Sequence, residues 1–116
     1  MSCCEPETGP AVALFRSLAD PARLMIVSRL AEGEARVVDL TRMLGLAQST
    51  VSKHLACLRD CGLVKGRAVG RQSLYRLTRP ELLTVLAAAE RLLAATGNAV
   101  DLCPVYGTID EPAAIA

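Results

Sequence analysis

The sequence of 116 residues predicts a mainly α-helical domain that carries one β-hairpin. Apolar residues recur at the three- and four-residue spacing of helices in four segments before Gly62 and again after Pro80. Between them, residues 63–69 and 72–77 contain β-branched and aromatic residues on either side of Gly70, as the strands of a hairpin do. Two short helices around a glycine turn, followed by such a hairpin, make a winged helix-turn-helix.

The first two helices are expected over residues 11–19 and from Pro21 towards Gly33. Asp20 is a typical N-cap, Pro21 suits the first helical position, and Gly33 suits a C-terminal stop. Helical spacing predicts the inward-facing residues, which are Leu14, Phe15 and Leu18 in the first helix and Leu24, Val27 and Leu30 in the second.

The helix-turn-helix is expected next. A short helix over residues 37–44 stops at Gly45, and a second helix, the recognition helix, begins near Gln48. The first of these helices is predicted to bury Val37, Leu40 and Leu44. The recognition helix has three faces: Val51, Leu55 and Leu58 form a core stripe, Ser49, Ser52 and Lys53 face the opposite way, and Thr50, His54, Cys57 and Cys61 follow one flank.

Gly66 is expected to weaken the first hairpin strand, because glycine has no side chain to pack. A last helix opens at Pro80 and ends at Gly97, with a broad apolar face that includes Leu82, Leu86 and Leu93. Core packing alone would explain this face, but we expect it to pair with a second subunit, so that the chain is a homodimer. The predicted organisation is a mobile tail over residues 1–9, the domain over residues 10–97, and a second tail over residues 98–116.

Charge is unevenly distributed along the chain. Residues 42–79 hold eight basic residues and one acidic residue, a net charge of +7, whereas the rest of the chain holds five basic and eleven acidic residues, a net charge of −6. A basic segment of this kind indicates nucleic-acid binding. A thiol-rich metal-buffering or redox protein is the rival class, but such a protein needs no basic stripe.

Composition argues against several other classes of protein. Apolar runs such as residues 82–89 are too short for a bilayer, which needs roughly 20 residues, so no membrane association is expected. The start, MSCCEPETGP, is not a signal peptide, and we expect a cytoplasmic protein with reduced thiols. Five cysteines then indicate metal or redox chemistry rather than a disulfide scaffold. The single histidine and the absence of a nucleophile–base pair or phosphate-binding glycine loop argue against an enzyme.

The start of the recognition helix is expected to enter the major groove of DNA. Gln48 can pair with an adenine edge, hydroxyls can contact bases or phosphates, and Lys53 suits a phosphate. The hairpin is expected to contact phosphates or the minor groove. The predicted DNA-binding residues are Gln48, Ser49, Thr50, Ser52 and Lys53 on the helix and Arg67, Arg71 and Gln72 on the hairpin.

The segments LADPARLMIV, LGLAQSTVSKHLACLRDCGLV and GRQSLYRL resemble the ArsR/SmtB family of bacterial metal-sensing repressors, over about residues 11–96. The resemblance implies a homodimer that binds double-stranded operator DNA without metal and releases it when a metal ion binds. The family's cysteine pair on the third helix is absent here, since residues 34–39 read EARVVD, and its histidine-containing zinc site on the last helix is absent too. Ala47 stands where many relatives carry a capping Ser or Thr, which leaves the start of the recognition helix less firmly set.

Cys57 and Cys61 lie one helical turn apart, so their thiols can reach one ion. Cysteines placed like Cys57, Cys61 and Cys103 resemble the cadmium- and lead-sensing branch, in which the recognition helix supplies two thiolates and the C-terminal segment a third. Thiolate coordination favours soft ions, so we expect Cd(II) or Pb(II) as the effector, with Zn(II) or As(III) as alternatives. Cys4 is a further candidate ligand by the same resemblance.

Three alternatives stay open at this point. Cys57 and Cys61 could be small buried apolar residues, or a redox switch, although a helix C-terminus raises the pKa of the Cys61 thiol and disfavours the switch. Cys3 and Cys4 could capture arsenite. His54 shares a flank with Cys57, but we expect a hydrogen-bonded helix histidine rather than a ligand.

Overall fold

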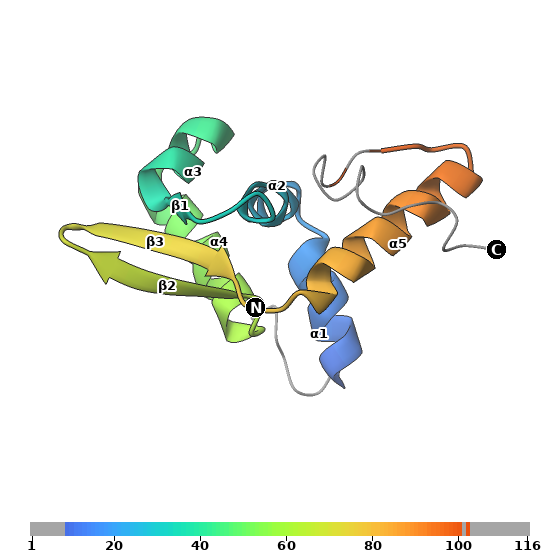
Figure 1. Ribbon diagram of the computed structural model, residues 1–116, viewed down its shortest axis with the longest axis horizontal. Coiled ribbons are helices and arrows are strands. Elements are labelled where there is room, and N and C mark those ends of the chain that lie inside the picture. The colour runs from blue at the N-terminus through green and yellow to red at the C-terminus, as the bar shows by residue number, and fades with distance from the viewer. Residues whose placement is uncertain (1–8, 101, 103–116) are drawn as a thin grey trace.

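The computed structural model of the chain describes residues 9–100 and 102. Its elements, in order, are α1 (Gly9–Leu18), α2 (Pro21–Leu30), β1 (Ala35–Arg36), α3 (Val37–Leu44), α4 (Gln48–Asp60), β2 (Val64–Val69), β3 (Gln72–Leu77) and α5 (Glu81–Ala95). The predicted winged helix-turn-helix is confirmed. The hairpin of β2 and β3, called the wing below, extends from one end of the helical body, and α1 and α5 lie at the other end (Figure 1).

Local sequence explains where the helices begin and end. The Asp20 carboxylate accepts a hydrogen bond from the Arg23 backbone N–H at 3.1 Å and caps α2, as predicted. Gly45, with φ of 68°, ends α3 in the left-handed region that glycine adopts without strain. Ala47 provides no side-chain cap, yet α4 begins at Gln48 as expected. Packing of its apolar face therefore compensates for the missing cap.

The core lies where α2, α3, α4 and α5 meet the sheet. The predicted stripe of α4 is confirmed, since Val51, Leu55 and Leu58 are all buried. Ile26 of α2 is also fully buried, although it was not among the predicted inward residues. The other large buried side chains of this core are Val27, Leu30, Leu40, Leu63, Val64, Leu82 and Leu86, while Leu14, Leu18, Leu24, Val37 and Leu44 are partly buried against it.

The prediction for α1 is wrong at one position. Phe15, expected inward with Leu14 and Leu18, is 62% exposed, and the buried residues of α1 are Ala13 and Ser17. The helix is turned so that its small residues pack closely against the body, which leaves the large aromatic side chain outside. Leu93 of α5, also expected on an apolar face, is half-buried.

The sheet contains a strand that the sequence did not predict. β1 pairs antiparallel with β3, which pairs with β2, so the order is β1-β3-β2. Gly66 and Tyr75 are register partners, and a Cβ on Gly66 would lie 2.8 Å from the Tyr75 ring. Glycine therefore makes room for a ring that packs against the core. Among the described residues, no helix is long and apolar enough to cross a membrane.

Candidate nucleic-acid interface and cysteine pair

The polar face of α4 is open to solvent. Gln48, Ser49, Ser52 and Lys53 are exposed and Thr50 is half-buried, whereas the core stripe lies on the other side of the helix. The side chains predicted to read DNA are thus available on the surface of the recognition helix.

A polar cavity of about 420 Å³ lies between the start of α3, the start of α4 and the turn of the wing. It brings together Gln48, Arg71 and Gln72, three of the residues predicted to bind DNA. Sequence reasoning missed the other polar residues of its wall, although Arg42 was counted in the basic segment. The complete lining is Arg36, Val37, Val38, Arg42, Gln48, Arg71, Gln72 and Ser73.

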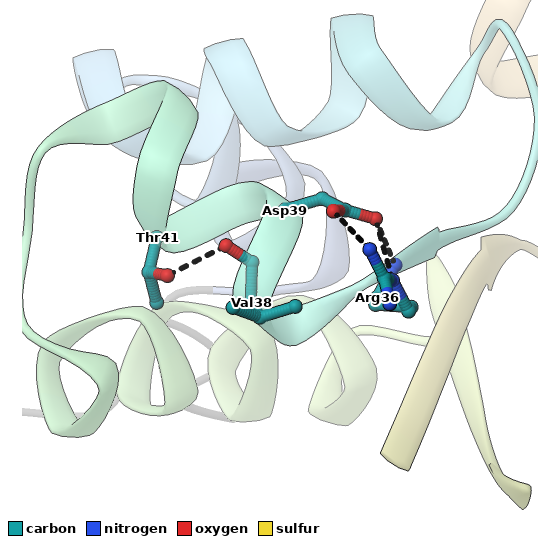
Figure 2. Close-up of polar contacts among 4 residues, drawn as sticks. All are labelled: Arg36, Val38, Asp39 and Thr41. Carbon is teal, nitrogen blue, oxygen red and sulfur yellow. Dashed lines mark hydrogen bonds and ion pairs between the residues drawn. The ribbon is translucent and has the colours of Figure 1, made fainter.

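Arg36 is held at the wall of this cavity by Asp39 (Figure 2). Its Nε donates to Asp39 Oδ2 at 3.1 Å and its Nη2 donates to Oδ1 at 3.0 Å. This hydrogen bonding lowers the pKa of Asp39 and raises the pKa of Arg36, helped by the attraction of the two charges. Arg42 and Arg71, by contrast, have no ion pair with any residue that the structure describes. They supply most of the available positive charge of the cavity.

Arg67 of β2 does not line the cavity. Its Nε donates to Glu34 Oε2 at 2.9 Å and its Nη2 donates to Oε1 at 3.0 Å. The hydrogen bond from Arg67 is the largest cause of a lowered pKa at Glu34. Partial desolvation opposes it, and the charges of Arg67 and Arg76 reinforce it. A residue predicted to contact DNA is therefore held by a carboxylate in the free protein.

Cys57 and Cys61 are both half-buried on α4. The sulfur of Cys61 lies 2.7 Å from the hydroxyl oxygen of Ser17, a fully buried residue of α1. Both cysteines are disulfide-bonded in this structure, so the thiolates that the sequence predicts as metal ligands would form only after reduction. The other three cysteines, Cys3, Cys4 and Cys103, lie outside the described residues.

Within residues 9–100 and 102, no three His, Cys, Asp or Glu side chains are grouped to hold a metal ion. Cys57 and Cys61, the two predicted ligands that lie within these residues, therefore have no third ligand grouped with them there. Leu102, the neighbour of Cys103, is anchored to the body of the domain. Its backbone N–H donates to Glu90 Oε2 at 2.6 Å, and its carbonyl accepts a hydrogen bond from the Ser28 hydroxyl.

His54 lies among polar groups of α2. Its Nδ1 is 3.3 Å from Arg23 Nη1 and 3.8 Å from Asp20 Oδ2. Arg23 also donates to the carbonyls of Arg16 and Ser17 at the end of α1, at 3.2 and 2.7 Å. These contacts connect α1, α2 and α4, and they give His54 the hydrogen-bonded role expected of a helix histidine.

Comparison with known proteins identifies related sequences. Residues 20–65 match the bacterial regulatory protein, arsR family. The chain is 35% identical over 101 residues to a probable mercury resistance operon repressor of Streptomyces lividans, covering 87% of this chain and 79% of the relative. It is 42% identical over 86 residues to the HTH-type transcriptional regulator CmtR of Mycobacterium tuberculosis, covering 74% and 73% of the two chains.

Solved structures share the fold. HlyU from Vibrio cholerae superimposes with a TM-score of 0.67 at 34% identity, covering 78% of this chain and 98% of that one. The NMR structure of the cadmium metal-sensor CmtR from Mycobacterium tuberculosis gives a TM-score of 0.54 at 44% identity, covering 65% of this chain and 78% of that one.

Proposed function

Since the chain belongs to the arsR family of bacterial regulatory proteins, we propose that it represses transcription as a homodimer on operator DNA and releases the DNA when a soft metal ion binds its cysteine thiolates. Proteins of this family are transcriptional regulators rather than enzymes. One observation carries the proposal: α4 bears both the exposed DNA-facing side chains and the cysteine pair.

In the DNA complex, α4 would enter the major groove with its first two turns. Gln48 and the hydroxyls of Ser49 and Ser52 would meet base edges, and Lys53 would contact a phosphate. The polar cavity beside these residues supports a backbone contact there, because Arg42 and Arg71 offer charge with no ion pair to a described residue. The wing would lie along the adjacent backbone.

The homodimer would form through α1 and α5. Phe15 and Val12 of α1 and Leu92 of α5 are 62%, 45% and 66% exposed, which leaves apolar side chains of both helices uncovered by this chain. Two recognition helices related by a two-fold axis would read half-sites about 34 Å apart, or a multiple of that distance. Sedimentation or light scattering at micromolar concentration tests this, and a monomer would contradict it.

Cys57, Cys61 and Cys103 would hold the effector, with Cys4 as a possible supplement. Thiolate sulfur forms its strongest bonds with soft cations, which favours Cd(II) or Pb(II) over Zn(II), and As(III) is the alternative effector. The names of two relatives, a cadmium metal-sensor and a mercury resistance operon repressor, support a soft ion. Leu102, the residue before Cys103, is held by hydrogen bonds with Ser28 of α2 and Glu90 of α5.

The contact between Cys61 and Ser17 supports a route from the thiols to DNA binding. Movement of Cys61 away from Ser17 would change how α4 packs on α1, while the same helix presents Gln48 and Lys53 to DNA. Allosteric coupling of about 1–3 kcal/mol between two sites changes an affinity about 5- to 150-fold.

The test is a gel shift on the DNA upstream of the chain's own coding sequence, under reducing conditions, with and without cadmium, lead, zinc or arsenite. We expect cadmium or lead to release the DNA. Cys103→Ser should weaken thiolate-to-metal absorption and abolish release, whereas the control Cys3→Ser should do neither. If Cys103→Ser still binds cadmium equally tightly and still releases DNA, the three-cysteine site is wrong, and Cys3 and Cys4 become the leading ligands.

A second candidate function is thiol redox sensing, because Cys57 and Cys61 are disulfide-bonded in the structure. The contact of Cys61 with Ser17 is made in this oxidised state, so reduction and reoxidation of the cysteines, rather than metal binding, would then change it. The two functions are separated by treating the metal-free protein with a mild oxidant and then with a dithiol reductant. Reversible release of DNA without metal would favour redox sensing, and unchanged binding after complete disulfide formation would exclude it.

A further inference from the structure

Glu34 is an acidic residue that directly precedes β1 and contacts the basic wing through Arg67. None of the three strands contains an aspartate or glutamate, and they contribute four basic side chains, Arg36, Lys65, Arg67 and Arg76. Glu34 directly precedes Ala35, whose register partner is Tyr75, so it lies beside Arg76 at the edge of the sheet. Its position puts a negative charge where the proposed function requires attraction to DNA.

The contact of Glu34 with Arg67 uses both oxygens and two guanidinium nitrogens, at 2.9 and 3.0 Å. A guanidinium binds a phosphate through the same two-bond geometry. Glu34 therefore occupies the donors through which Arg67 would contact the DNA backbone. Both side chains are partly exposed, 57% for Arg67 and 31% for Glu34, and exposed ion pairs of this kind are weak enough for another anion to displace.

We propose that Glu34 competes with DNA phosphates for Arg67 and thereby restrains the sequence-independent affinity of the wing for DNA. The inference rests on the proposed DNA-binding function. When a phosphate replaces the carboxylate, Arg67 exchanges one anion for another and Glu34 is left close to the DNA backbone. The exchange releases fewer counterions than a contact made by an unpaired arginine. The lowered pKa of Glu34 keeps its carboxyl ionised at neutral pH, so the competition persists there.

The experiment measures binding of a short DNA duplex of random sequence over a series of salt concentrations, so it needs no knowledge of the operator. Glu34→Gln is expected to bind about two- to fivefold tighter, the range of an exposed ion pair. Its plot of log affinity against log salt should be steeper by about 0.9, the value of one phosphate contact. Glu32→Gln is the matched control: it removes the same charge two residues away, from an exposed side chain.

Arg67→Gln, added to Glu34→Gln, should return the slope to that of the wild type, because the released arginine makes the new contact. Equal effects of Glu34→Gln and Glu32→Gln would overturn the inference, and so would a gain that persists without Arg67. Weaker binding by a Glu34→Gln protein with an unchanged melting temperature would overturn it as well, because Glu34 would then position the wing. If the wild type binds no duplex even at low salt, the DNA-binding function itself fails.

Discussion

Lys53 and Arg71 provide the sharpest test of which surface meets DNA. Lys53 is exposed on α4, and Arg71 is exposed at the wall of the polar cavity. Neither has an ion pair with a described residue, so each can neutralise one phosphate fully. Replacement of either by alanine should lower the slope of log affinity against log salt by about 0.9. The two residues lie on different elements, so we expect the slope changes to add.

The expected change in DNA affinity of each variant follows from the change in slope. Between about 50 and 200 mM salt the concentration changes fourfold, so the deficit of a single variant relative to wild type should shrink by about 3.5-fold, and that of the double variant by about 12-fold. Fluorescence anisotropy of a labelled duplex measures both affinities. Arg59→Ala is the control, because Arg59 lies in the last turn of the same helix, 3.7 Å from the carboxylate of Asp60. Unchanged slopes for Lys53→Ala and Arg71→Ala, or an equal change for Arg59→Ala, would refute the assignment of the DNA-facing surface.

Two further predictions concern the scaffold of the interface. Gly66→Ala should destabilise the fold by about 1–3 kcal/mol in urea unfolding, since its methyl group would meet the Tyr75 ring at 2.8 Å, and Tyr75→Leu in the same chain should remove that penalty. The pKa of Asp39 is lowered in the folded protein, mainly by the hydrogen bond from Arg36. Ionised Asp39 therefore stabilises the fold fully above the pKa of the unfolded carboxyl, about 3.9. This stabilisation is lost as the pH falls through the lower pKa of the folded state. The melting temperature measured against pH should show this loss in the wild type and not in Asp39→Asn. The same pH dependence in both proteins would contradict the prediction.

Local sequence was sufficient to predict the helices and the solvent-exposed face of α4. Val51, Leu55 and Leu58 repeat at helical spacing, and a helix with one apolar stripe must bury it. Asp20 and Gly45 mark helix ends through chemistry that depends on their immediate neighbours alone. For the same reason, the exposure of Gln48 and Lys53 followed from their position opposite the stripe.

Contacts between segments that are distant in the sequence could not be predicted from local patterns and were revealed only by the tertiary structure. The spacing of Phe15 placed it on a face of α1, but which face the rest of the chain covers is decided by packing. The two residues of β1 are too few to show an alternating pattern, and they form a strand only because β3 offers hydrogen-bonding partners.

The contacts within the candidate site also depend on how distant segments pack. Glu34 and Arg67 are 33 residues apart, and Ser17 and Cys61 are 44 apart, so neither contact leaves a trace in local spacing. Sequence periodicity reports the environment of a residue relative to its own helix or strand, because it arises from the backbone geometry of that element. Which charge is neutralised, and which cysteine sulfur lies next to a hydroxyl, follow from how the elements pack. In this protein, packing decided that one wing arginine is held by a carboxylate while the arginine at the turn of the wing has no ion pair among the described residues.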